Sequence, residues 1–222
     1  MSTKHWLLPM AAILVCPAGL PAQPKLEPVA IRLPNPGYEG TPPNLASIPN
    51  MEKLSGKERG PFLAPAGVKN VAKGKKVTSS ETDPVVGDLT MVTDGDTTQI
   101  EGNNVELGRG VQWVVIDLDA PHEIYGILFW HNYQPRVYFS VVVQTADDEG
   151  FTKNVQTWFN NDTANKARQG AGKNLNYVET YEGKLVDCKG VQARYVRLFS
   201  AGNNANELND YIEAEVFGRP AK

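Results

Sequence analysis

Two acidic segments, far apart in the sequence, carry the side chains best suited to chemistry. The first is Asp94-Gly95-Asp96, in which the glycine allows a tight turn between two carboxylates. The second is the segment 211–218, where Glu213 and Glu215 would share one face of a strand, because side chains repeat direction every two residues. Ca²⁺ binds carboxylate and carbonyl oxygens of this kind. The alternative, which spacing alone favours, is a plain hairpin turn and two solvent-facing glutamates.

Polar and aromatic residues in the loop 130–136 form a second candidate site. Proteins hold sugars with an aromatic ring beneath the apolar face of the sugar and with planar polar groups that bond to its hydroxyls. The candidate ligand-binding residues are His131, Tyr133, Arg136, Asn160 and Asn161. In the alternative interpretation Trp130 is a core residue, His131 is solvated and Arg136 belongs to a surface ion pair.

Residues suited to catalysis are few. After the predicted export signal the chain holds two histidines, His122 and His131, and no Gly-x-Ser-x-Gly nucleophile motif. The glycine-rich segments 108–110 and 170–172 lack the strand-to-helix context that phosphate binding requires. A glycosidase needs only two suitably placed carboxylates, so a small hydrolase stays open as an alternative. The residue content favours a binding module without catalytic residues.

These candidate residues need a scaffold, and the sequence from about Val68 onward predicts one built of strands. β-Branched and aromatic residues dominate there, and no window of 11 residues carries a helical apolar stripe. Short strands separated by Gly, Asn and Asp turns indicate an all-β fold, an antiparallel β-sandwich or jelly roll. The predicted strands include 111–119, 124–130, 137–143, 155–159, 194–199 and 211–217.

The N-terminal part of the chain reads as an export signal followed by a spacer. Residues 1–22 combine a short positive start, an apolar stretch too short to span a membrane, and small residues near a predicted cleavage point. Cys16 raises the alternative of a lipid anchor, which is disfavoured because Val15 precedes it where a small residue is expected. Eleven of the 16 prolines fall within residues 17–65, which predicts an extended, poorly packed tether over 23–66.

Charge and cysteine content narrow the range of partners. The net charge is −3, without the clustered basic surface that nucleic acid requires. If Cys16 leaves with the signal, Cys188 has no partner for a disulfide, and it is expected to be a small buried hydrophobe. No cluster of His and Cys supports a zinc site. A hydrophobic content of 41% is enough for one sizeable core.

Five segments, taken in order, resemble the discoidin domain, also called the coagulation-factor C-terminal type, and the related family 32 carbohydrate-binding modules. The matching segments are Asn70-Val71-Ala72-Lys73-Gly74, Val92-Thr93-Asp94-Gly95-Asp96, Trp113-Val114-Val115-Ile116-Asp117-Leu118, Ala193-Arg194-Tyr195-Val196-Arg197-Leu198 and Ile212-Glu213-Ala214-Glu215-Val216-Phe217-Gly218. The resemblance covers residues 68 to 218. It implies an eight-stranded jelly roll of galactose-binding-like topology for a domain at 67–219.

The resemblance also implies a structural Ca²⁺ site. Its ligands would be the side chain of Asp94 and backbone oxygens of Met91 and Asp96, with Glu213 closing the cage from the last strand. Glu215 shares the face of Glu213 and is the fallback ligand. Such an ion would tie the final strand to an early loop. Similar modules hold a saccharide in loops at one end of the sandwich, which agrees with a site at the loop 130–136.

These observations together predict a secreted, non-catalytic module that attaches to a glycan or polysaccharide. The alternative is an envelope protein–protein interaction or scaffold module, in which the proline-rich tether acts as the spacer. Sugar binding that depends on the His131 loop would favour the first function, and binding that needs the tether would favour the second. The expected location is outside the cytoplasm, either secreted or in the periplasm or cell envelope, with no transmembrane segment.

Overall fold

Strands make up nearly all of the regular structure in this computed structural model, which describes residues 25–35, 45–54, 56–134 and 136–221. The predicted signal peptide at 1–22, with Cys16, lies outside the described residues. Within the described ranges, no helix has the length and apolar character needed to cross a membrane.

Ten strands and two short 3₁₀ helices occur in the described residues. The strands are β1 Leu26–Pro28, β2 Leu63–Pro65, β3 Lys69–Asn70, β4 Lys76–Ser79, β5 Val105–Leu107, β6 Gln112–His131, β7 Val142–Ala146, β8 Gln156–Asn160, β9 Lys184–Ser200 and β10 Asn209–Pro220. The 3₁₀ helices are η1 Leu45–Ser47 and η2 Leu89–Thr93.

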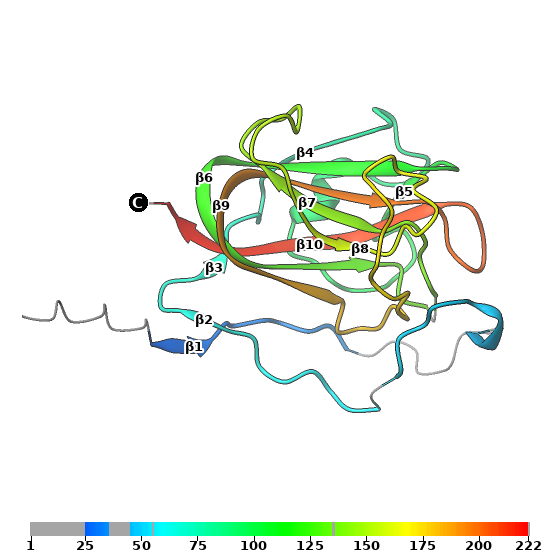
Figure 1. The fold of residues 1–222 in the computed structure, drawn as a ribbon, viewed down its shortest axis with the longest axis horizontal. Helices are drawn as coiled ribbons and strands as arrows, with labels where there is room; N and C mark the ends of the chain where they lie inside the picture. Colours follow the sequence, from blue (N-terminus) through cyan, green and yellow to red (C-terminus); the bar gives the residue numbers. More distant parts are fainter. Residues whose placement is uncertain (1–24, 36–44, 55, 135, 222) are drawn as a thin grey trace, which may run out of the picture.

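The sandwich is built around β6 and β9, which pair in antiparallel fashion and curve together from one layer into the other (Figure 1). Residues 112–117 of β6 pair with 195–200 of β9, and residues 122–129 pair with 184–193. The register shifts between these two stretches, at a bend where Asp119 has a φ of 67°. The β6–β9 ribbon therefore belongs to both layers.

Each half of the ribbon has its own neighbours. In the first layer β4 pairs with the first half of β6, and β7 and β8 extend the sheet from the second half of β9. In the second layer β10 pairs with the second half of β6 and carries β3 and β5 on its other edge. All of these pairings are antiparallel, so the predicted all-β sandwich is confirmed.

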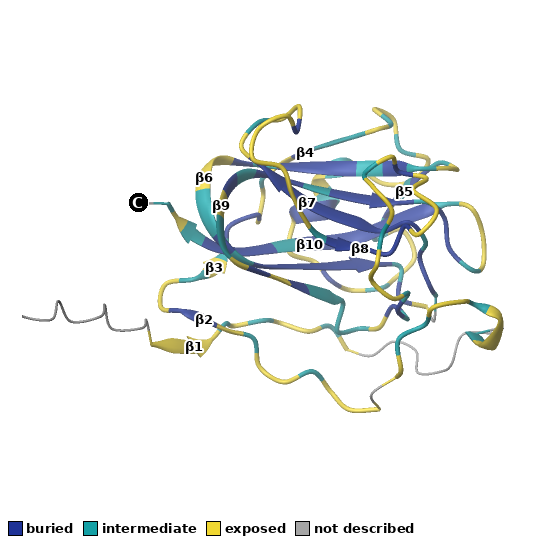
Figure 2. Cartoon of the chain, viewed as in Figure 1, coloured by how far each residue is buried: buried dark blue, intermediate teal, exposed yellow. Residues whose placement is uncertain are grey.

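The core lies between the layers, where the inward side chains of both sheets are shielded from solvent (Figure 2). In β6 the inward residues include Val114 and Ile116, whereas Val115 joins a separate small cluster with Tyr195 on the outer face. The strand is thus apolar on both faces, as the sequence predicts. Cys188 is fully buried in the core, and burial raises the pKa of its thiol, so it is a packing residue.

The segments 25–35, 45–54 and 56–66, here called the strap, pack along the outside of the second layer (Figure 1). β1 pairs with β2, and Val29 N donates to Phe62 O at 2.8 Å. The strap covers an apolar patch on the outer face of β6 and β10. The buried residues of this patch are Leu128, Trp130, Tyr133, Ile212 and Phe217, and the strap residues against it are Val29, Ile31 and Phe62.

The described part of the tether contacts the domain through Val29, Ile31 and Phe62, whereas most of its other residues are exposed. Proline prevents the strap from forming a core of its own, yet its apolar side chains complete a patch that would otherwise face water. Gly126 of β6 makes the contact possible, because a Cβ there would lie 2.8 Å from the Phe62 ring.

Replacing Phe62 with Ala should destabilise the protein by about 2 kcal/mol, because the substitution removes a ring from a partly closed apolar contact. Chemical denaturation followed by tryptophan fluorescence measures the free energy of unfolding. The matched control is Leu63→Ala on the next residue, whose side chain is 49% exposed and should cost less than about 0.5 kcal/mol. Equal effects of the two substitutions would show that the strap does not pack as described.

Candidate functional site

A cavity of about 620 Å³ opens at one end of the second layer, where three loops meet. Residues 99–104 lead into β5, residues 132–134 and 136 follow β6, and residues 206–208 precede β10. The end of β6 and the start of β10 are neighbours because Tyr211 pairs with His131. The antiparallel register therefore brings loops from distant parts of the sequence to one place.

Arg136 and Asp210 form the charged centre of this cavity. Arg136 Nη1 lies 3.3 Å from Asp210 Oδ2, and both side chains are largely buried. The carboxylate of Asp210 also accepts hydrogen bonds from the Tyr138 hydroxyl at 3.0 Å and from Asn104 Nδ2 at 3.2 Å. Three donors thus fix the carboxylate, and the carboxylate in turn fixes the guanidinium of Arg136.

Amide side chains line the rest of the cavity. Gln99 Nε2 donates to Asn132 Oδ1 at 2.9 Å, and the same oxygen accepts from the backbone N of Gln134 at 3.2 Å. Gln99 Oε1 is buried without a hydrogen-bond partner in the described residues. A buried polar atom without a partner is costly, so this oxygen is suited to accept a hydrogen bond from a ligand hydroxyl.

The charge in the cavity is predominantly negative. Glu101, Glu106 and Asp210 line it together with a single cation, Arg136. Partial burial, and then the neighbouring charge of Asp210, raise the pKa of Glu106. The cavity is therefore better suited to neutral groups that donate hydrogen bonds than to anions.

The structure corrects the prediction for His131. Its ring is 0% exposed, Nδ1 lies 2.6 Å from Glu179 Oε1, and the ring stacks on Tyr138 with centroids 4.2 Å apart. A residue at this depth cannot touch a sugar at the surface, because it lies at the end of β6 and points between the layers. Trp130 is also fully buried, as its core interpretation predicted.

Three other predicted ligand residues have structural contacts. Tyr133 is 3% exposed and lies in the patch beneath the strap, where its hydroxyl donates to Thr97 O and accepts from Gln99 N. Asn161 accepts from Val141 N at 2.6 Å, and Asn160 donates to Gly170 O at 3.0 Å.

Of the five predicted ligand residues, the structure thus places only Arg136 at the cavity. Asn161 instead bonds to Val141 N, and Asn160 lines a separate hollow beside Trp158, so neither shares a ligand site with Arg136. Sequence reasoning missed Asp210 and Gln99. The alternation of polar residues at 132, 134 and 136 was the available signal for the loop that it did find.

The predicted cation site lies where η2 and the following turn meet β10. Glu213 is 0% exposed, and its Oε2 accepts from Gly95 N at 3.1 Å. Its Oε1 has no partner in the described residues. The structure therefore brings Glu213 against the Asp94-Gly95-Asp96 turn, which spacing alone could not establish.

Glu213 is a buried acid whose pKa is strongly shifted. Burial is the main cause that raises the pKa of Glu213 to about 9, opposed by the Gly95 amide and reinforced by the charges of Asp94 and Glu215. Burial also raises the pKa of Glu215, whose Oε2 likewise lacks a partner among the described residues. Both oxygens are hard donors of the type that Ca²⁺ prefers.

Asp94 and Asp96 lie in the same turn, and a side-chain oxygen of each accepts a hydrogen bond from a backbone amide. Asp94 Oδ1 accepts from Asp96 N at 2.7 Å, and Asp96 Oδ1 accepts from Thr98 N at 2.9 Å. Met91 lies in η2, and its sulfur accepts from Asp88 N. The described ranges contain no group of three or more His, Cys, Asp or Glu side chains arranged around a common point for a metal. A cation here would depend on backbone oxygens as well.

The chain matches no protein-family model and no curated protein. Among solved structures, the family 89 glycoside hydrolase of Clostridium perfringens aligns with 68% of this chain at 18% identity and a TM-score of 0.51. This chain spans 15% of that hydrolase. Chitosan-binding module 1 of a Paenibacillus sp. IK-5 chitosanase/glucanase aligns over 67% of this chain and 98% of its own, at 19% identity and a TM-score of 0.45.

A pectin-binding carbohydrate-binding module aligns over 65% of this chain and 91% of its own, at 21% identity and a TM-score of 0.47. At these identities the likeness concerns the fold. The resemblance predicted from the five sequence segments is confirmed at that level. The chain shares an antiparallel β-sandwich fold with these structures.

Without added cation, the stability of the protein should fall as pH rises from 6 to 9. The folded state holds a proton on Glu213 up to a pKa of about 9, whereas the unfolded chain releases it near 4.5, so stability is present at low pH and lost as pH rises. The slope approaches about 1.4 kcal/mol per pH unit for one proton.

Denaturant titrations in EDTA across this pH range measure the slope. Glu213→Gln should flatten it, because the amide carries no titrating proton. Glu149→Gln removes one exposed acid elsewhere and should leave the slope unchanged. A wild-type slope that survives in Glu213→Gln would contradict the assignment.

Proposed function

We propose that this protein is a non-catalytic carbohydrate-binding module that holds a neutral saccharide at the cavity around Arg136. The observation that carries the proposal is the fixed Arg136–Asp210 pair in a cavity lined by amide side chains. The volume of about 620 Å³ lies within the range of about 300–1,000 Å³ typical of small-molecule sites.

The chemistry of the cavity supports a polyhydroxylated ligand. A guanidinium and several amides are planar donors and acceptors, which match pairs of adjacent sugar hydroxyls. Carboxylates accept hydrogen bonds from hydroxyls, and Gln99 Oε1 offers a further acceptor that is already desolvated. The excess of acids disfavours an anionic sugar at this place. Export to the cell envelope or medium, expected from residues 1–22, belongs to the same proposal.

A glycan array probed with the whole chain should give saturable binding to at least one neutral saccharide. Arg136→Lys should weaken this binding by about tenfold or more, because an ammonium cannot reproduce the planar pair of donors. Arg109→Lys is the matched control, since Arg109 is 79% exposed and pairs with Glu207 outside the cavity. A folded protein that binds no neutral saccharide would refute the proposed function.

We also propose a structural Ca²⁺ held by Glu213 and the side chain of Asp94, with backbone oxygens of Met91 and Asp96. The buried Glu213 Oε1 without a partner supports this ligand set. The ion would neutralise Glu213 and tie β10 to the loop after η2. The chain itself contributes a carboxylate that is already desolvated, so little rearrangement of β10 is needed.

Saturating Ca²⁺ should raise the melting temperature by about 5 °C or more, because a ligand that binds only the folded state stabilises it by mass action. Differential scanning fluorimetry in Ca²⁺ and in EDTA measures the shift. Glu213→Gln should abolish the shift, whereas Glu149→Gln should keep it. Equal shifts in both variants would place the ion elsewhere.

A further inference from the structure

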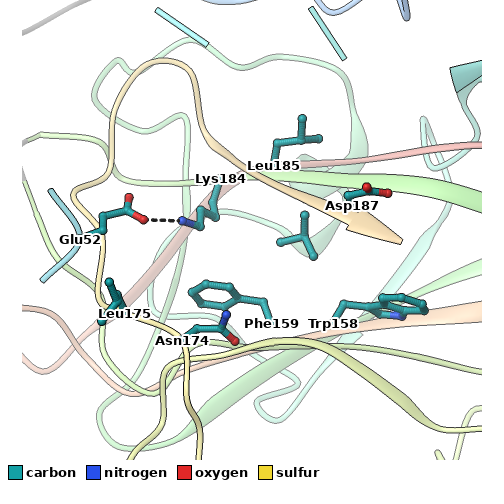
Figure 3. Close-up of a pocket in the computed structure, with 9 residues that line it drawn as sticks. Glu52, Trp158, Phe159, Asn174, Leu175, Lys184, Leu185 and Asp187 are labelled. Atoms are coloured by element: carbon teal, nitrogen blue, oxygen red, sulfur yellow. Dashed lines mark hydrogen bonds and ion pairs between the residues drawn. The ribbon is translucent and has the colours of Figure 1, made fainter. Parts of the chain in front are cut away.

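A groove lies between the two layers of the sandwich, away from the cavity around Arg136. It lies between β8, the edge strand of the first layer, and residues 184–187 of β9, at the edge of the second (Figure 3). Its volume is about 390 Å³. An adjoining hollow of about 270 Å³ shares Trp158, Phe159 and Asn174 with it, so the groove continues along β8.

Lys184 is the central charged group of this groove. Its ammonium lies 5.1 Å from the centre of the Phe159 ring and 4.3 Å from that of Tyr177. The side chain is only 19% exposed. A cation that is partly desolvated between aromatic rings attracts an anion more strongly than one in open water.

The anion that Lys184 contacts in the structure comes from the strap. Glu52 Oε2 lies 3.2 Å from Lys184 Nζ, and Figure 3 shows the two side chains meeting across one end of the groove. The Glu52 side chain is 42% exposed. Its backbone is held separately, because Glu52 N donates to Asn176 O at 2.8 Å. The carboxylate can therefore rotate away without unfolding the strap.

The other charges of the groove favour an anion in place of Glu52. Asp187 is already paired with Lys189 at 2.8 Å. Lys173, which lines the adjoining hollow, forms no ion pair with any carboxylate in the described part of the chain. With Glu52 turned away, the groove would hold two cations, Lys184 and Lys173, without a balancing acid. This is the opposite of the charge in the cavity around Arg136.

The remaining lining groups suit a sugar. The Trp158 indole is held by a bond from Nε1 to Thr145 Oγ1 at 2.9 Å, and the indole lines both halves of the groove. Asn174 Oδ1 accepts from Asn160 N at 2.8 Å, and Asn174 lines both halves of the groove. An aromatic ring and an amide donor beside a cation are the groups that a carboxylated sugar ring requires.

We propose that this groove is a second saccharide site, specific for carboxylated polysaccharides, and that Glu52 occupies it as an internal substitute for the uronate carboxylate. The ligand carboxylate replaces Glu52 on Lys184, and the chain continues past Trp158 toward Lys173. This proposal and the proposed function have only one point in common, which is that the ligand is a sugar. Its residues are separate from those around Arg136.

Isothermal titration calorimetry of the whole chain with polygalacturonate, alginate and hyaluronate tests this proposal. At least one of these polymers should bind, and Glu52→Gln should tighten that binding about threefold by removing a competitor that forms a partly exposed ion pair. Lys184→Met, which keeps the contact with the rings, should weaken it about tenfold or more. Glu58→Gln changes the same charge at an exposed strap position and should stay close to wild type.

Several outcomes would overturn the proposal. They are failure of all three polymers to bind either wild type or Glu52→Gln, and weaker binding by Glu52→Gln. Undiminished binding of a control polymer whose carboxyl groups have been reduced to alcohols would also overturn it. Loss of binding in Arg136→Lys with retention in Lys184→Met would place acidic sugars in the loop cavity instead. That last result would remove the second site and contradict the preference of the cavity for neutral saccharides, while carbohydrate binding itself would stand.

Discussion

The antiparallel pairing of β6 with β9 through both layers is the constraint on which the rest of the structure depends. A ribbon that bends from one sheet into the other closes the sandwich on that side with backbone hydrogen bonds. At the bend, Arg194 donates to both carboxylate oxygens of Asp117, at 2.7 and 2.8 Å. Within the described residues, the two layers are not joined by strand pairing at two other places, between β8 and β9 and between β4 and β10. The groove that Lys184 lines lies at the first of these boundaries. At the second lie η2 and the turn that contacts Glu213.

Buried polar groups explain why several residues that looked like ligands became part of the interior. His131 and Glu179 are both fully buried, and Tyr177 donates to the same oxygen of Glu179 at 2.8 Å. Tyr138 stacks on His131 and donates its hydroxyl to Asp210. This chain of contacts runs from the core to the rim of the cavity. His131 therefore acts on the cavity only indirectly. It fixes the ring of Tyr138, which in turn orients the carboxylate of Asp210.

Periodicity and turn chemistry were sufficient to predict the fold, because strands buried on one or both faces have a recognisable pattern of apolar residues. The segment 111–119 is an example, with apolar residues on both faces and a central place in its sheet. Residues of a binding site have no such pattern. Asn160 and Asn161 have the right chemistry for a sugar, but backbone groups took up their hydrogen bonds. Asp210 became part of a site only because strand register placed it opposite the loop that carries Arg136.

The position of the strap was even harder to predict from the sequence. Its prolines predict an extended chain, and an extended chain without periodicity gives no sign of where it will lie. Its place is set by an apolar patch on the outer face of β6 and β10, which it covers together with Val68, Tyr181 and Leu185. Once held there, the strap brings Glu52 to Lys184 at the boundary between the two layers. The segment that looked like a spacer thus supplies one wall of the groove, and a partly exposed carboxylate on that wall is the simplest group for an incoming uronate to replace.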